Sequence, residues 1–498
     1  MQMKNKKLEV LLILAVFAVL VVVFANFFPE IKLPFTENAK IKFLSFNELF
    51  DFSSPKENLK ADSITENLMV SDSAAAKSDS LQDLMINGDL DNLQALLDSL
   101  PRDSNFVNPK TDQGTALDDF FTALLNDRDS LPIHIAHYGD SQLEGNRVTG
   151  NLRQKFQEKF GGSGVGFVPF RDIASNINYS RYSSPNWTRY TVFHDRIKGT
   201  YYGMSGEVFR FNNYARIKND SAKIANGGDS TLVIGYDKAI LKVKHTLPYR
   251  RMSIMYGKGT TKNYLKIYND ANNTEIYSDS LNQSDYYVKK PIKLSYPVNN
   301  LKVELSGEGS LDYYGLMFEG DTGIYVDNYA IRGHSGDGLM LINPSYLAKQ
   351  VKETNTRLVI FQFGANVVPS IKNDAGCKYI ENAYYDLFKR FKDALPGVSV
   401  LVISVGDLAA KSNGQYVSYR IIPKIRDAQQ RAAINAGCAF WDLHDAMGGD
   451  NSILVWTKKK LATYEGHLTT KGQEIMANLL FNTIMIEYSS FLLNNKSK

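Results

Sequence analysis

The chain has 498 residues, of which 44% are hydrophobic and 22% charged, a composition typical of a globular protein too long for a single core. Its 57 Lys and Arg exceed its 53 Asp and Glu by four, which leaves no basic surplus to neutralise a phosphate backbone. This balance excludes nucleic acid as the expected partner and predicts about two or three structural units.

Residues 1–30 have the composition of a transmembrane anchor. The basic run KNKK precedes LEVLLILAVFAVLVVVFANFF, which is long enough to cross the roughly 30 Å core of a bilayer as a helix. The lysines favour a cytoplasmic amino terminus, and the bulky residues of FANFFPE do not form a signal-peptidase site. We therefore expect a single-pass protein of the inner, cytoplasmic membrane whose remaining chain is extracytoplasmic or periplasmic.

Residues 31–114 have the composition of a polar tether. They are rich in Ser, Asp, Asn and Lys and contain few aromatic residues, so they bury little apolar surface. Only LDNLQALLDSL predicts a short helix within this stretch.

Residues 115–174 begin an α/β pattern. The apolar residues of TALDDFFTALLND share one helical face, and LPIHIAHYGD predicts a buried strand. NRVTGNLRQKFQEKFGG then predicts an amphipathic helix that starts near Arg147 and ends at glycine. The tripeptide GDS, with Ser141, lies between that strand and that helix.

Residues 175–322 change to short alternating runs such as STLVIGYD, AILKVKHTL and NLKVELSG. Such runs predict an inserted antiparallel β-sandwich or jelly-roll module. Within it, Tyr179, Tyr182, Trp187 and Tyr190 lie among polar residues, as a sugar-stacking face requires. Aromatic residues that pack one sheet on another would give the same pattern, and both interpretations stay open.

Residues 323–498 resume the α/β rhythm. GIYVDNYAIRG, RLVIFQFGAN, VSVLVISVGD and CAFWDLHDAM predict buried strands that alternate with helical segments. This alternation predicts a parallel sheet covered by helices on both faces, so the β module interrupts one α/β domain. Cys377 and Cys438 are far apart in the sequence, which does not show whether they pair, and we interpret them as buried apolar residues.

Four short blocks follow predicted strand ends or precede a helix at the same edge, where catalytic groups of an open α/β sheet gather. They contribute Ser141 in HYGDSQLEG, Gly336 in RGHSGDGL, Asn366 in FQFGAN and His467 in GHLTTKGQEIMANLL. A nucleophile, a backbone N–H donor, an amide donor and a general base are the parts that acyl transfer needs. Each block alone also fits a structural role: a turn, a loop glycine, a helix cap or a packed histidine.

The helix after His467 is predicted to be capped by Thr470, with Gln473 completing a capping box. Zinc and P-loop chemistry lack their motifs in this sequence, which contains no H-E-x-x-H, paired C-x-x-C or G-x-x-x-x-G-K-[ST]. His134, His137 and His334 lie near the predicted site, but their positions at strand ends explain them equally well. We predict neither a metal nor another cofactor.

The ordered set of GDS, the glycine of SGD, G-x-N and HLT-x-KG resembles the SGNH (GDSL-type) hydrolases over residues 115–172 and 323–490. This resemblance implies a flavodoxin-like parallel sheet. It also implies that Ser141 is the nucleophile and His467 its base. The backbone N–H groups of Ser141 and Gly336 and the side-chain amide of Asn366 would form the oxyanion hole.

One position departs from that family pattern. The family usually has an aspartate three residues before the catalytic histidine, and this chain has Tyr464. Glu465, Asp442 and Asp445 are the candidate acids that could orient the ring instead. A dyad oriented by a backbone carbonyl is a further alternative.

An anchor, a tether and an inserted module resemble the architecture of extracytoplasmic SGNH proteins that remove or add O-acetyl groups on peptidoglycan or exopolysaccharide. The resemblance implies an acylated glycan as substrate, and our first hypothesis is an anchored serine esterase that removes O-acetyl groups. The alternative is an O-acetyltransferase that works with a membrane-bound O-acyltransferase. A third hypothesis is a catalytically weak glycan-binding envelope protein, which the missing aspartate permits.

Overall fold

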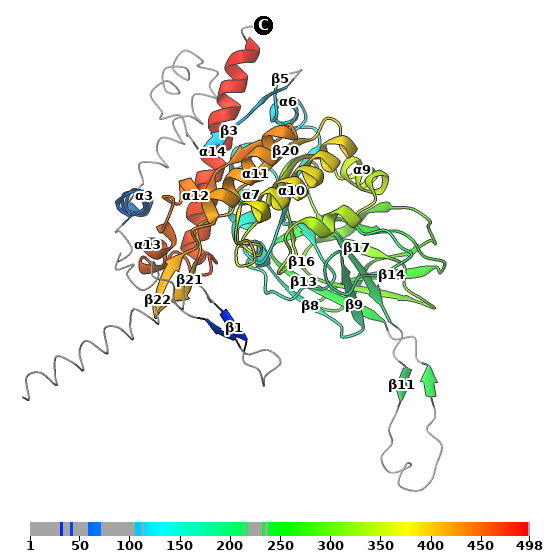
Figure 1. The fold of residues 1–498 in the computed structure, drawn as a ribbon. Coiled ribbons are helices and arrows are strands. Elements are labelled where there is room, and N and C mark those ends of the chain that lie inside the picture. The colour runs from blue at the N-terminus through cyan, green and yellow to red at the C-terminus, as the bar shows by residue number, and fades with distance from the viewer. Residues whose placement is uncertain are drawn as a thin grey trace, which may run out of the picture. The chain divides into compact units, whose positions relative to one another are not determined.

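The computed structural model describes residues 30–32, 40–42, 58–70, 105–111, 114–212, 215–217, 232–234 and 238–496 (Figure 1). The predicted anchor, apart from residue 30, and the helix predicted near LDNLQALLDSL lie outside these residues. Strands β1 (Glu30–Lys32) and β2 (Lys40–Lys42) pair antiparallel in a separate unit. All the remaining elements belong to one compact unit that begins at Asn58.

A mostly parallel sheet forms the centre of this unit, as the sequence predicts. Its strands, in sheet order, are β18 (Gly323–Ala330), β6 (Pro132–Gly139), β19 (Thr356–Gln362), β20 (Ser399–Ile403), β23 (Ala439–Trp441) and β3 (Phe106–Val107). The first five are parallel to one another, and β3 is antiparallel to β23. Numbered along the chain, the parallel strands have the order 2-1-3-4-5 of flavodoxin-like sheets.

Helices cover both faces of this sheet (Figure 1). One face packs on α6 (Asp118–Asn126), α7 (Arg147–Phe160) and α14 (Thr470–Lys496). The other face packs on α9 (Pro344–Glu353), α10 (Asp374–Ala394) and α11 (Ile422–Asn435). Alternate residues of each strand enter the two cores, so Ile135 lies in one cluster and Ala136 in the other.

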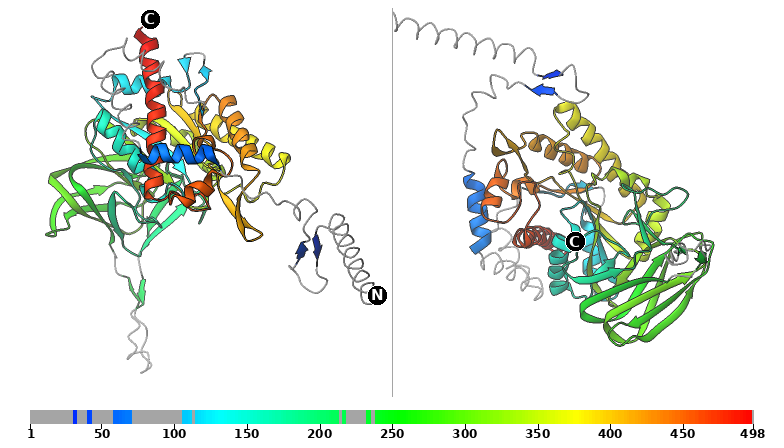
Figure 2. Two further views of the ribbon diagram at one scale, coloured as in Figure 1. Left: turned by 90° about the vertical axis from the view of Figure 1, so that its left-hand side faces the viewer. Right: turned by 90° about the horizontal axis from the view of Figure 1, so that it is seen from below.

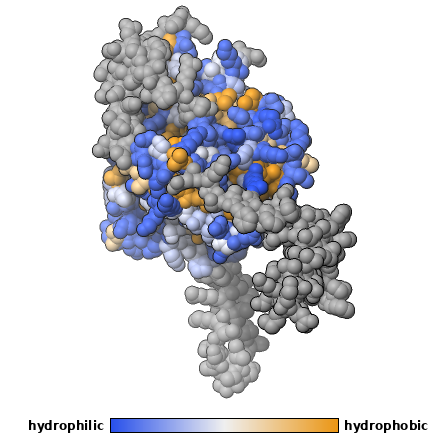
Figure 3. Space-filling model, turned by 60° about the vertical axis from the view of Figure 1, so that its left-hand side comes forward, coloured by the Kyte–Doolittle hydropathy of each residue, from blue (hydrophilic) through white to orange (hydrophobic). Residues whose placement is uncertain are grey.

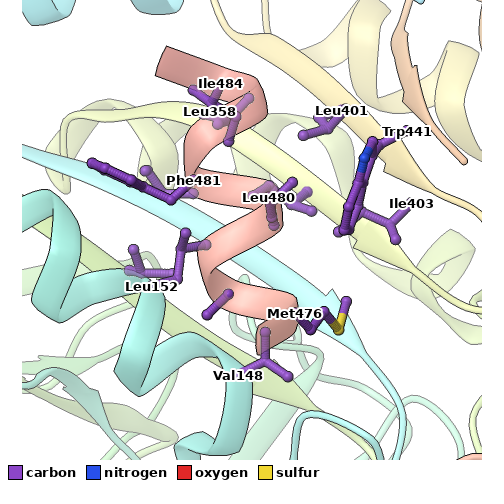
Figure 4. Packing of buried hydrophobic residues seen from close by; sticks show 14 of the residues in the cluster. Val148, Leu152, Leu358, Leu401, Ile403, Trp441, Met476, Leu480, Phe481 and Ile484 are labelled. Atoms are coloured by element: carbon purple, nitrogen blue, oxygen red, sulfur yellow. The ribbon is translucent and has the colours of Figure 1, made fainter. Parts of the chain in front are cut away.

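Helix α14 belongs to the core. Met476, Leu480 and Ile484 lie between helix α7 and the strands, where they meet residues such as Leu152 and Leu401 (Figure 4). By length and composition, α14 is the one helix among the described residues that could cross a membrane, but 61% of its most apolar window is buried inside the protein. Burial of this kind is typical of a core helix in a globular protein.

The predicted β-rich module is an antiparallel sheet. Its described strands are β7 (Gly166–Val168), β8 (Tyr179–Ser183), β9 (Trp187–Thr191), β10 (Glu207–Phe211), β13 (Ala239–Tyr256), β14 (Asn263–Asn269), β15 (Thr274–Leu281), β16 (Val288–Gly307) and β17 (Tyr313–Phe318). Backbone pairing joins these strands into one antiparallel sheet, which lies beside the α/β core (Figure 2). Strand β7 pairs with β17, so this sheet also includes residues that precede position 175.

The remaining elements are short. They are β4 (Lys110–Thr111), β5 (Gly114–Thr115), β11 (Ala215–Ile217), β12 (Leu232–Ile234), β21 (Ala409–Ser412), β22 (Gln415–Ser418), η1 (Glu144–Asn146), η2 (Asp337–Leu341), α12 (Leu443–Ala446) and α13 (Ser452–Lys458). On the face that Figure 3 draws, hydrophilic residues surround separate hydrophobic patches. Cys377 and Cys438 are both buried and unpaired, so they pack as apolar residues.

The aromatic residues that favoured a sugar-stacking face are mostly packing residues. Tyr179 and Trp187 are buried, and the Trp187 ring stacks on Phe170 with centroids 4.6 Å apart. The indole N–H of Trp187 also donates to the carbonyl of Ile240. Only Tyr182 is largely exposed, so the four aromatics do not form one exposed platform.

Part of the predicted tether is an ordered helix, α3 (Leu59–Val70), which contacts α13 (Figure 2). The side chain of Asn58 donates to the carbonyls of Gly448 and Asp450 at 2.9 and 2.8 Å. Ala61 is fully buried, and a side chain at Gly448 would collide with it. The composition of residues 31–114 does not predict this contact, because only a few small residues of α3 are buried in it.

A buried chain of charges links the two sheets. His134 on β6 has both ring nitrogens on carboxylates, with Nδ1 2.7 Å from Asp327 and Nε2 2.8 Å from Glu319. Glu319, which follows β17, also pairs with Lys289 on β16 at 2.7 Å. Burial alone would lower the pKa of His134, but the two carboxylates outweigh it and raise the pKa to about 9.

We expect this chain to make stability depend on pH above neutrality. The folded protein holds the His134 proton more tightly than the unfolded chain, so the stabilisation is complete below pH 6.5 and is lost as pH rises through about 9. The loss amounts to about 3 kcal/mol. Urea unfolding from pH 6 to pH 10 measures it. The matched variant His134→Gln should be less stable at pH 6 by about 3 to 5 kcal/mol, with a gap that narrows towards pH 10. A gap independent of pH would contradict this assignment.

Candidate active site

The order of the strands brings the sequence-predicted residues together. Ser141 follows β6 and Asn366 follows β19, on the two sides of the point where the strand order reverses. Ligands of open α/β sheets bind at this point, at the carboxyl ends of the strands. Gly336 follows β18, and His467 precedes α14.

The Oγ atom of Ser141 lies 2.9 Å from Nε2 of His467. These residues are 326 positions apart in the chain, and the antiparallel sheet lies between them in the sequence. Both side chains are half-buried, so they are shielded by protein on one side and reachable from solvent on the other. This is the hydrogen-bond distance that a serine nucleophile and its base require.

Gly336 occupies a backbone conformation that favours glycine. Its φ of 100° lies in the left-handed region, and a Cβ there would lie 3.1 Å from the Phe363 ring and 3.2 Å from Leu387. Among the described residues, no acceptor is hydrogen-bonded to the backbone N–H of Gly336 or of Ser141. Both groups are therefore available to a ligand.

Asn366 has a more constrained amide. Its Nδ2 atom donates to Oδ2 of Asp140 at 2.8 Å and to the carbonyl of His334 at 3.1 Å. Both amide hydrogens are thus engaged in this structure. Donation to an oxyanion would require the amide to share one of these bonds, and the longer bond to His334 is the weaker of the two.

Asp140 is a site residue that the sequence reasoning did not assign. It is buried, and its Oδ1 accepts from the backbone N–H of Gln142 while its Oδ2 holds Asn366. Burial raises the pKa of Asp140 to about 6; the Gln142 N–H opposes that rise, and the neighbouring Glu144 adds to it. Its place between the strand and Ser141 in GDS was the available signal.

The candidate acids do not contact the histidine. Asp442 caps α12 and pairs with Arg426 at 2.7 Å, and Asp445 pairs with Lys60 at 2.6 Å. Glu465 is exposed. Among the described residues, no carboxylate hydrogen-bonds to the ring of His467.

A chain of polar side chains, His137, Gln362 and Gln142, connects the sheet to the loop of His467. His137 on β6 bonds to Gln362 at 3.1 Å, and Gln362 donates to Gln142 at 3.3 Å. Gln142 in turn lies 3.5 Å from the carbonyl of Gly466, the residue before His467. Gln142 therefore connects the serine turn to the histidine loop.

The other histidines near the site have structural partners. His334 accepts from the backbone N–H of Gly338 at 3.0 Å, and His134 and His137 are bonded within the core. The part of the chain that the structure describes has no group of three His, Cys, Asp or Glu residues placed to hold a metal ion.

The cap of helix α14 differs by one residue from the predicted capping box. Thr469, not Thr470, accepts from the backbone N–H of Gly472 at 3.4 Å. Gln473 donates its side-chain amide to the carbonyl of Leu468 at 2.7 Å. The two adjacent threonines make the position of the cap ambiguous in the sequence.

Comparisons with known proteins bear on the fold. No family model and no curated protein matches the sequence. A solved peptidoglycan O-acetylesterase matches 76% of this chain and 99% of its own with a TM-score of 0.57 at 18% identity, so the two chains share a fold.

Two other solved structures are less similar. An acetyl xylan esterase has a TM-score of 0.25 at 16% identity over 32% of this chain and 78% of its own. A family two carbohydrate esterase from Cellvibrio japonicus has a TM-score of 0.23 at 12% identity over 63% of this chain and 99% of its own.

We expect Asp140→Asn to alter the pH dependence of stability. The raised pKa means that ionisation of Asp140 opposes folding, so its contribution to stability is lost as pH rises from 3.8 through about 6. The free energy of unfolding of the variant should therefore rise relative to the wild-type value by up to about 3 kcal/mol between pH 4 and pH 7. Denaturant titrations at both pH values measure this difference, and a variant whose stability stays constant or falls relative to the wild type from pH 4 to pH 7 would refute the assignment.

Proposed function

We propose that this protein is a membrane-anchored, extracytoplasmic serine esterase that removes O-acetyl groups from a cell-envelope glycan. The observation that carries the proposal is the 2.9 Å contact between Ser141 Oγ and His467 Nε2. Two unused backbone N–H groups, those of Ser141 and Gly336, support it. The shared fold with a peptidoglycan O-acetylesterase favours a glycan ester as the substrate class.

The acylation step follows from this geometry. Ser141 Oγ attacks the ester carbonyl carbon while its proton passes to Nε2 of His467. The carbonyl oxygen becomes an oxyanion, which the N–H groups of Ser141 and Gly336 and the amide of Asn366 would stabilise. Collapse of this intermediate breaks the bond to the sugar oxygen, which receives the proton from His467 and leaves as a hydroxyl.

The second step releases the acyl group. Water attacks the acyl-serine as His467 takes one of its protons, and the second tetrahedral intermediate expels Ser141 Oγ, which regains that proton. The products are the free sugar hydroxyl and acetate. A sugar hydroxyl in place of water would complete an acetyl transfer by the same chemistry.

The location of the protein in this proposal rests on its sequence. The apolar run before residue 30 would hold the chain at the membrane, and the polar stretch after it would give the catalytic unit reach. Docking of α3 on the catalytic unit limits that reach to the residues between the apolar run and position 58. The glycan would then be one that lies near the membrane surface.

Substitution of Ser141 tests the nucleophile. Ser141→Ala should abolish hydrolysis of p-nitrophenyl acetate because no other group occupies the position of its Oγ, and His467→Ala should lower kcat by about 10³-fold or more. Ser130→Ala, an exposed serine at the opposite end of β6, is the matched control and should retain full activity. Steady-state kinetics at pH 7 to 8 measure these effects.

Three outcomes separate the hypotheses. Activity that survives Ser141→Ala would exclude Ser141 as the nucleophile. Acetyl transfer to a sugar acceptor that exceeds hydrolysis would make the protein an O-acetyltransferase, for which a membrane-bound O-acyltransferase is the expected donor partner. Glycan binding without turnover by the wild-type protein would favour a binding function.

Substitution of Asn366 tests the oxyanion donor. Asn366→Ala should lower kcat by about 10² to 10³-fold with little change in KM, because the amide would bind the transition state more strongly than the substrate. Asn373→Ala serves as the control, since Asn373 caps helix α10. A wild-type kcat in Asn366→Ala would show that the amide only holds Asp140 and His334.

A further inference from the structure

The position of the absent family aspartate holds an aromatic stack. The ring of Tyr464 lies on the ring of Tyr416, with centroids 3.6 Å apart and planes within 3° of parallel. Tyr416 belongs to β22 of the β21–β22 hairpin, and both side chains are half-buried. Each ring covers one face of the other, so water is excluded from between them.

The residues around His467 form a short turn closed by its own backbone hydrogen bonds. The backbone N–H of Thr463 donates to the carbonyl of His467 at 2.8 Å, and Thr469 donates to Leu461 at 2.9 Å. An antiparallel bridge joins Ala462 to Leu468 between these two bonds. Tyr464 lies inside this turn, so the direction of its ring and the direction of His467 are set by the same backbone.

The hairpin holds this turn at two points. The first is the Tyr464 and Tyr416 stack, and the second is a 2.7 Å bond from the backbone N–H of Ala409 to the carbonyl of Tyr464. The hairpin is itself fixed to the sheet, because Asp407, beyond the end of β20, accepts from Ser418 at 2.8 Å and from the N–H of Ile453 at 3.0 Å. A continuous set of contacts therefore runs from β20 to the histidine turn.

An acid beside a catalytic histidine has two effects: it fixes the direction of the ring, and it stabilises the imidazolium. We infer that the Tyr464 and Tyr416 stack takes over the first of these, and that both tyrosines are positioning residues for His467. This inference rests on the proposed function, in which His467 is the base for Ser141.

The stack should act on the chemical step more than on substrate binding. Neither tyrosine hydrogen-bonds to Ser141 or His467. Loss of the stack therefore removes no reacting atom, but it broadens the range of directions that the imidazole of His467 samples. A displacement of about 1 Å in such a group can reduce the rate by on the order of 100-fold. The effect should therefore fall on kcat and on the rate at which Ser141 becomes acylated.

The experiment compares the full-length variants Tyr464→Ala, Tyr416→Ala and their double variant, with Tyr464→Phe and Tyr416→Phe as matched controls that keep the ring. With p-nitrophenyl acetate, each alanine variant should lose about 10- to 100-fold in kcat with KM within about twofold. The double variant should be no more than about threefold worse than either single variant, because one contact is removed in all three. Both phenylalanine variants should keep kcat within about threefold, since the stack needs no hydroxyl.

The rate at which a fluorophosphonate probe labels Ser141 gives a second readout that does not depend on turnover. It should fall in the alanine variants in parallel with kcat, while thermal unfolding confirms that each variant is folded. Wild-type kcat and labelling in folded Tyr464→Ala or Tyr416→Ala would overturn the inference, and so would multiplicative losses in the double variant. Ser141 that is unreactive in the wild-type protein would overturn the proposed function and this inference together, whereas reactive Ser141 with insensitive tyrosines would overturn only the stack.

Discussion

The register of β6 between β18 and β19 is the constraint on which the site depends. Gly139, at the end of β6, is opposite Ala330 on one side and Gln362 on the other, so three strands end at the same level of the sheet. A Cβ at Gly139 would lie 2.5 Å from Leu143 and 3.0 Å from the carbonyl of Gln362, which leaves room only for glycine. A shift of one residue would turn every side chain of β6 to the opposite face and carry Ser141 away from His467.

The inserted sheet is compatible with this register because both of its connections to the α/β unit are held by strand pairing and by buried hydrogen bonds. Strand β17 pairs with β7 and with β13, and β18 follows it within a few residues. Glu319, in the connection, is bonded to His134 of β6, while Asp327 of β18 bonds to the same ring and to the backbone N–H of Phe167. Parallel strands need a long crossover connection, and here helix α7 and the antiparallel sheet together form it. Removing one member of this buried chain would leave an unpaired charge in the core.

Much of the fold and of the candidate site is predictable from the sequence because the signals are local. Buried strands followed by amphipathic helices predict the parallel sheet, and the ordered set of blocks that resembles the SGNH hydrolases predicts that Ser141 and His467 meet. The sequence does not predict contacts between segments that are far apart in the chain. The hydrogen bond from Asn366 to Asp140 and the stack of Tyr464 on Tyr416 depend on which loops become neighbours, and no periodicity encodes that. Aromatic residues such as Trp187 were ambiguous, since a stacking face and a packed core use the same residues.

Asp140 places a carboxylate beside the oxyanion donors and not beside His467. Asp140 fixes the amide of Asn366 by a 2.8 Å bond, so it orients a donor, but its negative charge opposes the oxyanion that the donor would serve. Burial raises the pKa of Asp140 to about 6, so the ionised carboxylate that orients Asn366 is itself disfavoured at this position. With the orientation of His467 left to a stack of two neutral rings, the site limits the number of charges that it must bury around the acyl group.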